Sequence, residues 1–596
     1  MKRLDLEGFD LGALISSCVI ALVFICGFFV LAVKLKQVQV AETDKFVSVG
    51  ESQATRRVQT EGIRGRILDR DGVPLADNRV SFAVVCMPEA FRRKTWDEMF
   101  DSITNAIDTL GAAIGRKRTL SDRELKTHIQ QSRSVPLVVW RDVGDREVAV
   151  VSERAEDFPG FEIVESLERV YPNGSLAGHL LGYVGKERAE SLPGEEKFNF
   201  YYPEMKGRSG VEYYYNSFLK GVSGEKRLIV DARSFSTREW VVSEPRKGPD
   251  LRLTIDSELQ RVVESELKGE RGACVVLDPR TGDVLAMASA PKVDPNDFVP
   301  YLRQETKNRY EADISKPLLN RAAGGAYAPG SIFKPITALA GLEFGFPSTE
   351  TFDCRGLYHL GQMKLHCSNR SGHGLLDVRH ALMKSCNPFF CDLALDIGTN
   401  QLIQTAKTFG LGSKTGIDFS LDMAGTVPDG EWKQKMYHEK WFMGDLAHMA
   451  IGQGMLLVSP LQMARVAGAI GTGYLVTPHL KFDLESERKK LPFKQTNLDV
   501  VRDGMRLVVT GDHTGQGTGR RAAEGVGVAV AGKTGTAEIG LGATRRKNAW
   551  FMAYAPADNP TLAVAIVIEN GESGGQTAAP KVAAILRKKF PKESTK

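Results

Sequence analysis

A chain of 596 residues is long enough for several domains, and its composition, 42% hydrophobic and 25% charged, is ordinary for a globular protein. Lys and Arg together number 78 and Asp and Glu 73, so the formal net charge is only +5. This balance gives no support for a nucleic-acid-binding protein, and the sequence has no long repeat or extended low-complexity tract.

One segment near the N-terminus has the length and composition of a membrane-spanning helix. Residues 11–33 are 23 positions without a charge, and a helix of that length reaches about 34 Å, enough to cross a bilayer core of roughly 30 Å. A cleaved signal peptide is the alternative, but the apolar run exceeds a typical signal core and no clear A-x-A site follows it. We therefore expect a retained anchor after a short cytoplasmic tail over residues 1–10. Basic residues flank both ends of the span, so charge alone does not fix its orientation.

Residues 34–248 are predicted to form a mixed domain without a catalytic motif. The stretch 34–59, rich in Val, Gln and Glu, is compatible with a helical continuation of the anchor. Further along, Asp71-Gly72 between short apolar runs predicts a tight turn. A boundary is expected at the Lys-Gly-Pro-Asp sequence of residues 247–250, so residues 249–596 are predicted to form the second large domain.

The second domain begins and ends with strand patterns. A helix is expected over 257–268, followed by strands over 273–277 and 284–290 that flank a turn. Three more strands are expected near the C-terminus, over 525–536, 548–555 and 561–569. Between the two strand blocks the pattern is mainly helical. A sheet built from both ends of a domain, with a helical insert between them, fits a two-lobed α/β enzyme.

The first chemical motif is Ser331-Ile332-Phe333-Lys334, which sets a serine and a lysine one helical turn apart. The residues that follow read as a helix, so Ser331 is expected at a helix start, where unpaired N–H groups and the dipole favour negative charge. A serine needs an adjacent base to be a useful nucleophile. Lys334 can be that base if burial or nearby positive charge lowers its pKa. Taken alone, the pattern is more often a helix-capping Ser beside a surface Lys.

The second motif is Ser385-Cys386-Asn387, a small polar group expected on a loop between helices. Ser385 is a candidate to relay a proton between two lysines and a leaving amine. Asn387 is a candidate to hold a substrate amide. Alone, such a motif is more often a helix-capping Ser followed by a turn Asn.

The third motif, Lys533-Thr534-Gly535-Thr536, follows an apolar run and is expected on a strand. Lys533 would supply the positive charge that lowers the pKa of the first lysine. Gly535 would let a substrate backbone approach closely, and the hydroxyls of Thr534 and Thr536 would bind a substrate carboxylate. The backbone N–H groups of Ser331 and Thr536 are candidates for an oxyanion hole.

The order S-x-x-K, S-x-N, K-T-G is the catalytic set of penicillin-binding proteins and related β-lactamases, and together the motifs indicate a serine acyl-transfer enzyme. The chain resembles the class B penicillin-binding proteins, membrane-anchored D,D-transpeptidases that cross-link peptidoglycan. Its middle motif has Cys386 where the general pattern has Asp. Residues 64–72 (RGRILDRDG), residues 169–174 (RVYPNG) and the surroundings of Glu212 resemble the non-catalytic pedestal of that family.

The resemblance implies a fold and an activity. The fold would be an α/β (α+β) transpeptidase domain like that of the serine β-lactamases, with a five-stranded antiparallel sheet flanked by helices and a helical lobe. It would stand on an elongated, mixed pedestal behind one transmembrane helix. The acyl donor would be a D-Ala-D-Ala stem peptide, Ser331 would form the acyl-enzyme, and β-lactams would trap it. Catalysis would need no cofactor.

The resemblance also implies a location and a partner. The anchor would cross the bacterial inner membrane once with its N-terminus inside, and the catalytic domain would be periplasmic or extracellular. The partner would be a polytopic glycan polymerase that contacts the anchor and the pedestal.

Within class B the chain resembles most the elongation type, penicillin-binding protein 2. The resembling residues all lie in the second domain: residues 425–428 (GTVP), Trp432, Trp441, Gly444, Asp445, residues 451–454 (IGQG) and residues 459–462 (SPLQ). The division type shares parts of this pattern, and the tryptophans also suit ordinary core packing.

Four potential soft metal ligands share the second domain in the pattern C-x12-C-x5-H-x12-C: Cys354, Cys367, His373 and Cys386. A Cys3His set is a common closed, tetrahedral zinc sphere, and elongation-type relatives resemble it near the middle motif. If Ser385 and Asn387 face the cleft, Cys386 faces away, and a metal would brace the motif from behind. The alternatives are a disulfide among these cysteines and Cys391, in an oxidising compartment, and unliganded buried thiols.

Two other functions would use the same motifs. A D,D-carboxypeptidase or β-lactamase would take water as the acceptor, but the anchor and the long pedestal argue against it and no deacylating Glu is placed as in class A enzymes. A membrane-bound β-lactam sensor or a scaffold with an inactive site is the non-enzymatic alternative, but all five polar motif residues are present. A sensor would also need a cytoplasmic output domain, for which residues 1–10 are too few.

Overall fold

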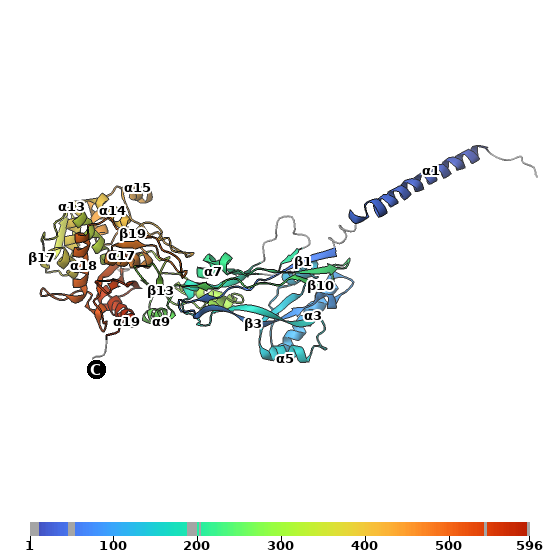
Figure 1. Ribbon diagram of the computed structural model, residues 1–596, viewed down its shortest axis with the longest axis horizontal. Helices are drawn as coiled ribbons and strands as arrows, with labels where there is room; N and C mark the ends of the chain where they lie inside the picture. Colours follow the sequence, from blue (N-terminus) through green and yellow to red (C-terminus); the bar gives the residue numbers. More distant parts are fainter. Residues whose placement is uncertain (1–10, 46–53, 188–198, 202–203, 541–544, 593–596) are drawn as a thin grey trace, which may run out of the picture.

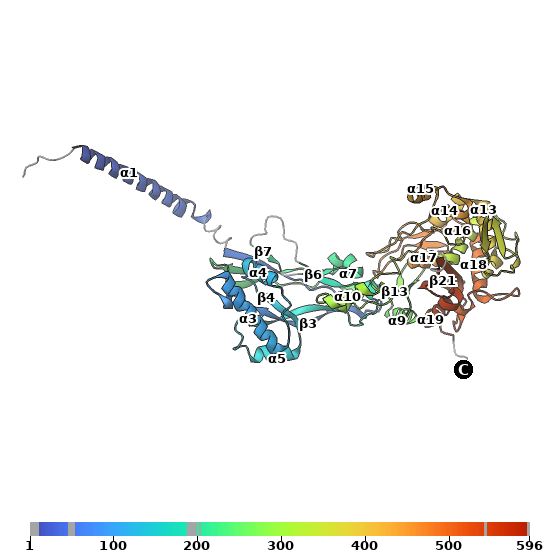
Figure 2. The same cartoon turned by 180° about the vertical axis from the view of Figure 1, so that it is seen from behind.

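The computed structural model describes residues 11–45, 54–187, 199–201, 204–540 and 545–592. An N-terminal helix, a middle region of sheets and a C-terminal region follow one another along the long axis (Figure 1, and from behind in Figure 2). The predicted tail over residues 1–10 lies outside the described residues.

The N-terminal helix α1 (Leu11–Lys36) carries the predicted membrane span. Over Leu14–Val40 it is long and apolar enough to cross a bilayer, and the most apolar part of this stretch is not buried by the rest of the chain. The helix passes into a π turn (Gln37–Ala41) and does not continue to residue 59, because Thr55–Thr60 forms strand β1 in a sheet. The chain thus has one N-terminal apolar helix, consistent with a single-pass membrane anchor.

The pedestal, which is the middle region, contains two sheets. The first has the order β10-β9-β1-β7, with β10 at Ser236–Ser243, β9 at Gly224–Val230 and β7 at Asn199–Tyr201. The second has the order β11-β2-β3-β4, with β5 also on β3; its strands are β11 (Leu251–Arg252), β2 (Ile67–Leu68), β3 (Pro74–Cys86), β4 (Leu137–Val143) and β5 (Phe161–Val170). A short pair, β6 (Val184–Glu187) with β8 (Glu204–Gly207), lies beside them.

Helices α3 (Trp96–Ile114), α4 (Asp122–Gln131) and α5 (Asp145–Glu153) accompany the second sheet. Capping boxes start α3 and α4, with Thr95 and Ser121 as the N-caps. Their apolar faces share one buried cluster with side chains of β3 and β4. This gives the pedestal a core of its own.

The predicted pedestal motifs meet at one buried carboxylate. The turn at Asp71-Gly72 forms between β2 and β3, where Asp69 Oδ1 accepts hydrogen bonds from the backbone N–H groups of residues 71 and 73. Arg64 from the first motif and Arg169 from the second both bind Glu212, at 2.7 and 2.8 Å. Glu212 lies on the short helix α7 (Gly210–Tyr214) and is fully buried.

The junction between the two large regions is built from both of them. Strand β11 lies after the predicted boundary at residue 249 but pairs in parallel with β2 of the pedestal. Across the junction, Asn296 exchanges two hydrogen bonds with the backbone of Tyr171, and Tyr215 donates a hydrogen bond to Asp418. The domain limits 34–248 and 249–596 stay predictions.

The C-terminal region is organised around a five-stranded antiparallel sheet in the order β13-β12-β22-β21-β20. Its strands are β12 (Gly272–Leu277), β13 (Val284–Ala290), β20 (Ala531–Ile539), β21 (Arg546–Ala555) and β22 (Leu562–Glu569). Alternate residues of β12 belong to different buried clusters: Ala273, Val275 and Leu277 to one, Cys274 and Val276 to the other. Both faces of the sheet are therefore covered.

Helices α9 (Ser257–Glu266) and α19 (Ala579–Lys589) contribute to the cluster on one face, and α11 (Lys334–Glu343) and α17 (Pro460–Thr472) to that on the other. The predicted strand over 525–536 was wrong at its start. Arg520–Ala523 forms a 3-10 turn, Gly525 has φ +73, and β20 begins only at Ala531.

A helical lobe is inserted between β13 and β20, as predicted. Its helices are α10 (Gln304–Ala312), α11, α12 (Val378–Lys384), α13 (Asn387–Ile397), α14 (Thr399–Thr408), α15 (Gly430–Tyr437), α16 (Met443–Ala450), α17 and α18 (Gln495–Thr510). Three small strand pairs decorate it: β14 (Phe352–Cys354) with β17 (Gly374–Leu376), β15 (Leu357–Leu360) with β16 (Met363–His366), and β18 (Tyr474–Val476) with β19 (Arg488–Lys490).

Candidate active site

Ser331 lies in a 3-10 turn, η4 (Gly330–Phe333), that leads directly into α11. The preceding Gly330 has φ +58, and its N–H donates to the carbonyl of Gly452 at 2.8 Å. A Cβ at this position would come 2.8 Å from the carbonyl oxygen of Thr536 on β20. Only glycine therefore lets the turn fit between the 452 segment and the edge of the sheet.

Ser385 and Cys386 form a two-residue joint between α12 and α13. Ser385 caps the end of α12 with φ +53, a left-handed conformation that is uncommon for a residue other than glycine. Cys386 is the N-cap position of α13, and Asn387 is the first residue of that helix. The side-chain amide of Asn387 donates to the carbonyl of His366 at 2.9 Å, which ties the β15–β16 pair to the joint.

Both motif lysines converge on the hydroxyl of Ser385. Lys334 Nζ lies 3.3 Å from Ser385 Oγ and also donates to the carbonyl of Ser385 at 2.7 Å and to Asn387 Oδ1 at 2.6 Å. Lys533 Nζ donates to Ser385 Oγ at 2.8 Å and to the carbonyl of Thr534 at 2.9 Å. The three sequence motifs therefore meet at one place, although they are up to 202 residues apart in the chain.

The two ammonium groups are in an environment that favours their neutral form. Both side chains are fully buried, and no ion pair joins either of them to a carboxylate in the part of the chain that the structure describes. Burial lowers the pKa of Lys334 to about 8. Burial, reinforced by the charge of Lys334, holds the pKa of Lys533 well below its usual value. A lysine with a lowered pKa can accept a proton near neutral pH.

The hydroxyl of Ser331 has no hydrogen-bond partner within 3.5 Å among the described residues. Lys334, one turn along, directs its amine to Ser385 and Asn387. Catalytic hydrogen bonds are often long before a substrate is bound. The geometry thus links the motif of Ser331 and Lys334 to Ser385, and through Ser385 to Lys533.

Strand β20 carries the third motif at the edge of the sheet. Thr534 Oγ1 lies 3.0 Å from Thr518 Oγ1, and Thr518 donates to the carbonyl of Met383, two residues before Ser385. Thr536 Oγ1 accepts from the N–H of Gly574 at 3.4 Å. Thr518 belongs to none of the sequence motifs and was not predicted, because its contact with Thr534 forms only in the folded chain.

Gly535 packs closely against the turn of Ser331 within the chain itself. A Cβ there would lie 2.9 Å from Ile332 Cγ2 and 3.0 Å from the carbonyl oxygen of Pro329. The turn that carries Ser331 therefore already requires a glycine at this position. The approach of a substrate backbone to Gly535 stays a prediction.

The four predicted metal ligands lie together directly behind the Ser385–Asn387 joint, with their ligand atoms all within 4.8 Å of one another. Cys367 Sγ is 3.4 Å from His373 Nδ1 and 3.9 Å from Cys386 Sγ. The Cys386 hydrogen bond lowers the pKa of the Cys367 thiol, while the same contact and burial raise that of Cys386. These donors fit a closed Cys3His sphere.

The disulfide alternative is not realised in the described part of the chain, where all eight cysteines are free. Cys391 lies outside the cluster and donates to the carbonyl of Ala447 at 3.4 Å.

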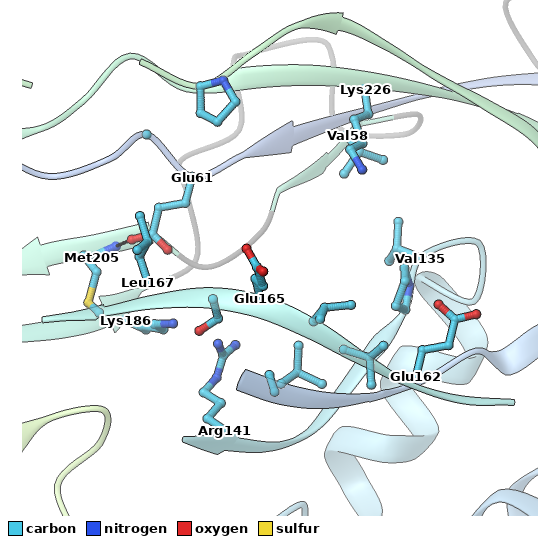
Figure 3. A pocket seen from close by; sticks show the side chains of 18 of the residues that line it. Val58, Glu61, Val135, Arg141, Glu162, Glu165, Leu167, Lys186, Met205 and Lys226 are labelled. Atoms are coloured by element: carbon cyan, nitrogen blue, oxygen red, sulfur yellow. Dashed lines mark hydrogen bonds between the residues drawn. The ribbon is translucent and has the colours of Figure 1, made fainter. Parts of the chain in front are cut away.

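The pedestal contains a separate hollow of about 530 Å³ between its two sheets. Figure 3 shows Val58 and Val135 toward one end of it and Glu61, Lys186 and Met205 toward the other. Burial raises the pKa of Glu61 and lowers that of Lys186. Arg64 of the first pedestal motif lines this hollow, but no residue of the motifs around Ser331, Ser385 and Lys533 does.

Comparisons with known proteins agree with this geometry. The family profile "Penicillin binding protein transpeptidase domain" matches residues 272–587, and "Penicillin-binding Protein dimerisation domain" matches residues 59–253. The peptidoglycan D,D-transpeptidase MrdA of Acinetobacter baumannii is 32% identical over 94% of this chain and 85% of its own length.

Two solved structures are similar along most of the chain. The complex between penicillin-binding protein PBP2 and MreC from Helicobacter pylori has a chain that is 30% identical, with a TM-score of 0.76 over 90% of this chain and 98% of that one. A peptidoglycan synthase complex that coordinates polymerization and crosslinking has a chain that is 28% identical, with a TM-score of 0.70 over 98% of this chain and 99% of that one. With these matches, the chain belongs to the class B penicillin-binding proteins of the PBP2 type, the peptidoglycan D,D-transpeptidases of cell-wall elongation.

Proposed function

We propose that Ser331 is the nucleophile with which this D,D-transpeptidase cross-links stem peptides. Its hydroxyl oxygen attacks the carbonyl carbon of the peptide bond between the two terminal D-Ala residues of a donor. That bond breaks, the last D-Ala leaves as a free amine, and an ester joins the donor to Ser331. The amine of a second stem peptide then attacks the ester, forms the cross-link and releases the serine.

The two buried lysines and Ser385 would move the protons in this reaction. Neutral Lys334 accepts the proton of Ser331, and the Ser385–Lys533 pair delivers a proton to the leaving amine. The observation that supports this is the hydroxyl of Ser385, which lies 3.3 Å from Lys334 Nζ and 2.8 Å from Lys533 Nζ. The low pKa of Lys334, about 8, makes it a base at physiological pH.

The remaining motif groups would hold the substrate. Asn387 binds a donor amide, and the hydroxyls of Thr534 and Thr536 bind the terminal carboxylate beside Gly535. The backbone N–H groups of Ser331 and Thr536 stabilise the oxyanion of the tetrahedral intermediate. In support, β20 is the edge strand of its sheet, so part of its backbone has no strand partner on that side, and it adjoins the turn of Ser331.

Intact-mass measurement of the full-length protein with benzylpenicillin tests the assignment of Ser331. We expect one stable adduct on the wild-type chain and on Ser348→Ala, a matched control outside the site, and none on Ser331→Ala. An adduct on Ser331→Ala would refute the assignment. The lifetime of the adduct decides the acceptor: rapid loss of the adduct to water would favour a β-lactamase or carboxypeptidase activity, whereas a long-lived adduct favours transfer to an amine.

We also propose that Cys354, Cys367, His373 and Cys386 bind a structural zinc ion. The ion would fix the position of Cys386 and with it the two catalytic side chains on either side. Support comes from the convergence of the four ligand atoms, all within 4.8 Å of one another, and from their chemistry, since three thiols and one imidazole are a common donor set for structural zinc.

The zinc proposal is tested by elemental mass spectrometry on the folded protein. We expect about one equivalent of zinc, retained in Cys391→Ser and lost in Cys354→Ser with a lower thermal midpoint. A zinc-free protein whose thermal midpoint is the same with and without added zinc would refute it.

For the anchor, we propose that α1 crosses the bacterial inner membrane with its N-terminus inside and the pedestal and catalytic domain outside. The exposed apolar surface of α1 and its position at one end of the molecule support the crossing (Figure 1), and the resemblance to the membrane-anchored class B proteins supports the orientation. Protease added to intact spheroplasts should digest the catalytic domain; complete protection would refute this orientation.

For the partner, we propose that the anchor and pedestal contact a polytopic glycan polymerase. The similar peptidoglycan synthase complex couples polymerization to crosslinking, which supports this pairing. Co-purification of the full-length chain with its co-expressed polymerase should survive Ser331→Ala. It should be lost when residues 11–33 are exchanged for an unrelated span; equal recovery with the exchanged span would overturn the contribution of the anchor.

A further inference from the structure

A second hollow, in the catalytic region, has an excess of cationic over acidic side chains in its lining. It measures about 370 Å³ and lies between the end of α14, the middle of α17 and the β18–β19 pair. Figure 1 shows α14, α17 and β19 together in the upper part of this region. Five cations line it, and we call it the basic pocket: Lys407, Lys414, Arg465, Lys489 and Lys490. It shares no lining residue with the cluster around Ser331.

Arg465 forms the fixed part of the basic pocket. It projects from α17, a helix whose other residues are almost all buried. Its Nε donates to the carbonyl of Val476 at 2.6 Å, and a Cβ on Gly410 would come 2.7 Å from its Nη1. No carboxylate lies within 4.0 Å of its guanidinium among the described residues, and burial lowers its pKa. A guanidinium held by its Nε keeps donors free for a planar oxyanion.

The acidic groups nearby leave the basic pocket with excess positive charge. Glu487 is the one acid in its lining, and Asp429, in the adjoining hollow, lies 4.0 Å from Lys407 Nζ and offsets part of that charge. Asp422 is engaged by the hydroxyl of Thr415 and the N–H of Gly416, at 3.1 and 2.9 Å. Lys489 and Lys490 belong to β19, whose three residues are all exposed. A concave surface with an excess of one charge concentrates ligands of the opposite charge.

The basic pocket continues into a more neutral groove. The adjoining hollow shares Lys407 and Lys489, adds the amide side chains of Asn400 and Gln404 on α14, and contains one carboxylate, that of Asp429. Amides bind the hydroxyl, amide and carbonyl groups of sugars and peptides. The combined surface thus suits a ligand that has carboxylates at intervals along a neutral polar polymer.

We propose that the basic pocket binds the free carboxylates of an uncross-linked peptidoglycan strand, at a distance from the reacting bond. The inference rests on the proposed function, because such a strand is the polymer on which the enzyme acts. Every uncross-linked stem peptide ends in a carboxylate, so a strand with one stem in the active site carries further anions along its length. Two linked contacts raise the effective concentration of the reacting stem without any change in the catalytic groups.

The test measures binding of a soluble, uncross-linked glycan-peptide oligomer to full-length protein whose active site is first blocked with benzylpenicillin. The variant Lys489→Glu/Lys490→Glu changes two exposed residues, and Lys94→Glu/Lys268→Glu makes the same charge change elsewhere on the surface. We expect the affinity to fall at least tenfold in the first variant and to remain unchanged in the second. An oligomer with amidated carboxylates should bind the wild type as weakly as the normal oligomer binds the first variant.

Arg465→Lys, which keeps the charge but loses the planar fork, should bind with intermediate affinity. Equal affinity of the two double variants, or no effect of amidation, would overturn the inference. Binding of inorganic phosphate in preference to the oligomer would assign the basic pocket to a phosphate ligand and overturn it as well.

The benzylpenicillin adduct separates this test from that of the proposed function. All variants of the basic pocket should form the adduct at the wild-type rate. A normal adduct with equal affinities refutes only the basic pocket, whereas no adduct on the wild type refutes the assignment of Ser331.

Discussion

The Glu212 cluster of the pedestal and the lysine cluster of the catalytic region both bury charged side chains, but they treat the charge in opposite ways. In the pedestal, Glu212 is enclosed by Arg64 and Arg169, each within 2.8 Å, and its carboxylate is fully paired. In the catalytic region, Lys334 and Lys533 are equally buried, yet they meet at a neutral serine hydroxyl. The pedestal cluster therefore holds segments of the chain together, whereas the lysine cluster has the arrangement that the proposed proton transfer requires.

The pKa shifts follow from this difference. Burial by itself would raise the pKa of Glu212, but Arg169 and Arg64 outweigh it and the net pKa is lowered, so the carboxylate stays charged. No carboxylate is paired with Lys334 or Lys533 among the described residues to offset their burial, so burial lowers the pKa of both. A buried ion paired with opposite charges indicates a structural role. Buried ions of one sign without an opposite charge indicate a catalytic role.

The largest expected effect is the loss of the nucleophile or its base. Ser331→Ala should abolish covalent labelling by penicillin while the protein stays folded, and Lys334→Ala should slow labelling at least about 1000-fold because the serine loses its nearest base. Acylation rates by stopped-flow fluorescence, with circular dichroism as the folding control, would show this. Near-normal labelling of Lys334→Ala would transfer the base role to the Ser385–Lys533 pair.

The pedestal cluster should respond in the opposite way. Glu212→Gln leaves two buried arginines without a counter-charge and should lower the free energy of unfolding by about 3–5 kcal/mol. The acylation rate of the protein that remains folded should change little. Urea unfolding and penicillin labelling on the same samples would separate the two effects, with the exposed pair member Glu258→Gln as the control. A large loss of acylation rate without a loss of stability would contradict the contrast between the regions.

The pH dependence sharpens the same comparison. Lys334 must be neutral to accept a proton and its pKa is about 8, so the acylation rate should rise roughly 100-fold from pH 6 to pH 9 and then level off. The sign for Glu212 is reversed: its lowered pKa gives stability that is present above the pKa of the unfolded chain and lost as the pH falls through the folded value. Acylation rates and urea unfolding between pH 3 and 10 would test both. An acylation rate that is flat from pH 6 to 9 would exclude Lys334 as the base.

The sequence allowed much of the catalytic region to be predicted, because its three motifs carry chemistry that few other patterns share. Ser331, Ser385 and Lys533 were placed in one site, and four of the five sheet strands were located near their observed limits. The start of β20 was predicted too early, because the apolar residues before Ala531 have the composition of a strand although the chain turns at Gly525. The partner of Thr534 was missed because Thr518 reaches it only in the folded chain.

The pedestal was less predictable for a physical reason. Arg64 and Glu212 are separated by 148 residues, and nothing in the local pattern of either indicates that they pair. Resemblance to a family pointed to these segments, but their ionic contact is visible only in the fold. The long apolar run of α1 was the opposite case, since its length and composition alone indicate its role.

The smallest expected effect comes from adding one methyl group to a glycine, and it again distinguishes the two regions. A Cβ at Gly207 in the pedestal would lie 1.8 Å from the carbonyl oxygen of Glu212, while a Cβ at Gly535 would lie 2.9 Å from Ile332 in the turn of the nucleophile. Gly207→Ala should therefore lower the free energy of unfolding, because the backbone at Glu212 must move to make room for the methyl group. Gly535→Ala should slow acylation about tenfold, the equivalent of about 1.4 kcal/mol, within the usual range for overpacking.

Gly430→Ala is the matched control for this pair, because its nearest neighbour lies 3.6 Å from the added Cβ. It should leave both quantities unchanged. If Gly535→Ala lowered the stability but left the acylation rate intact, the contact between β20 and the turn of Ser331 would be a packing contact like that of Gly207. The difference between the two regions would then lie in their buried charges alone.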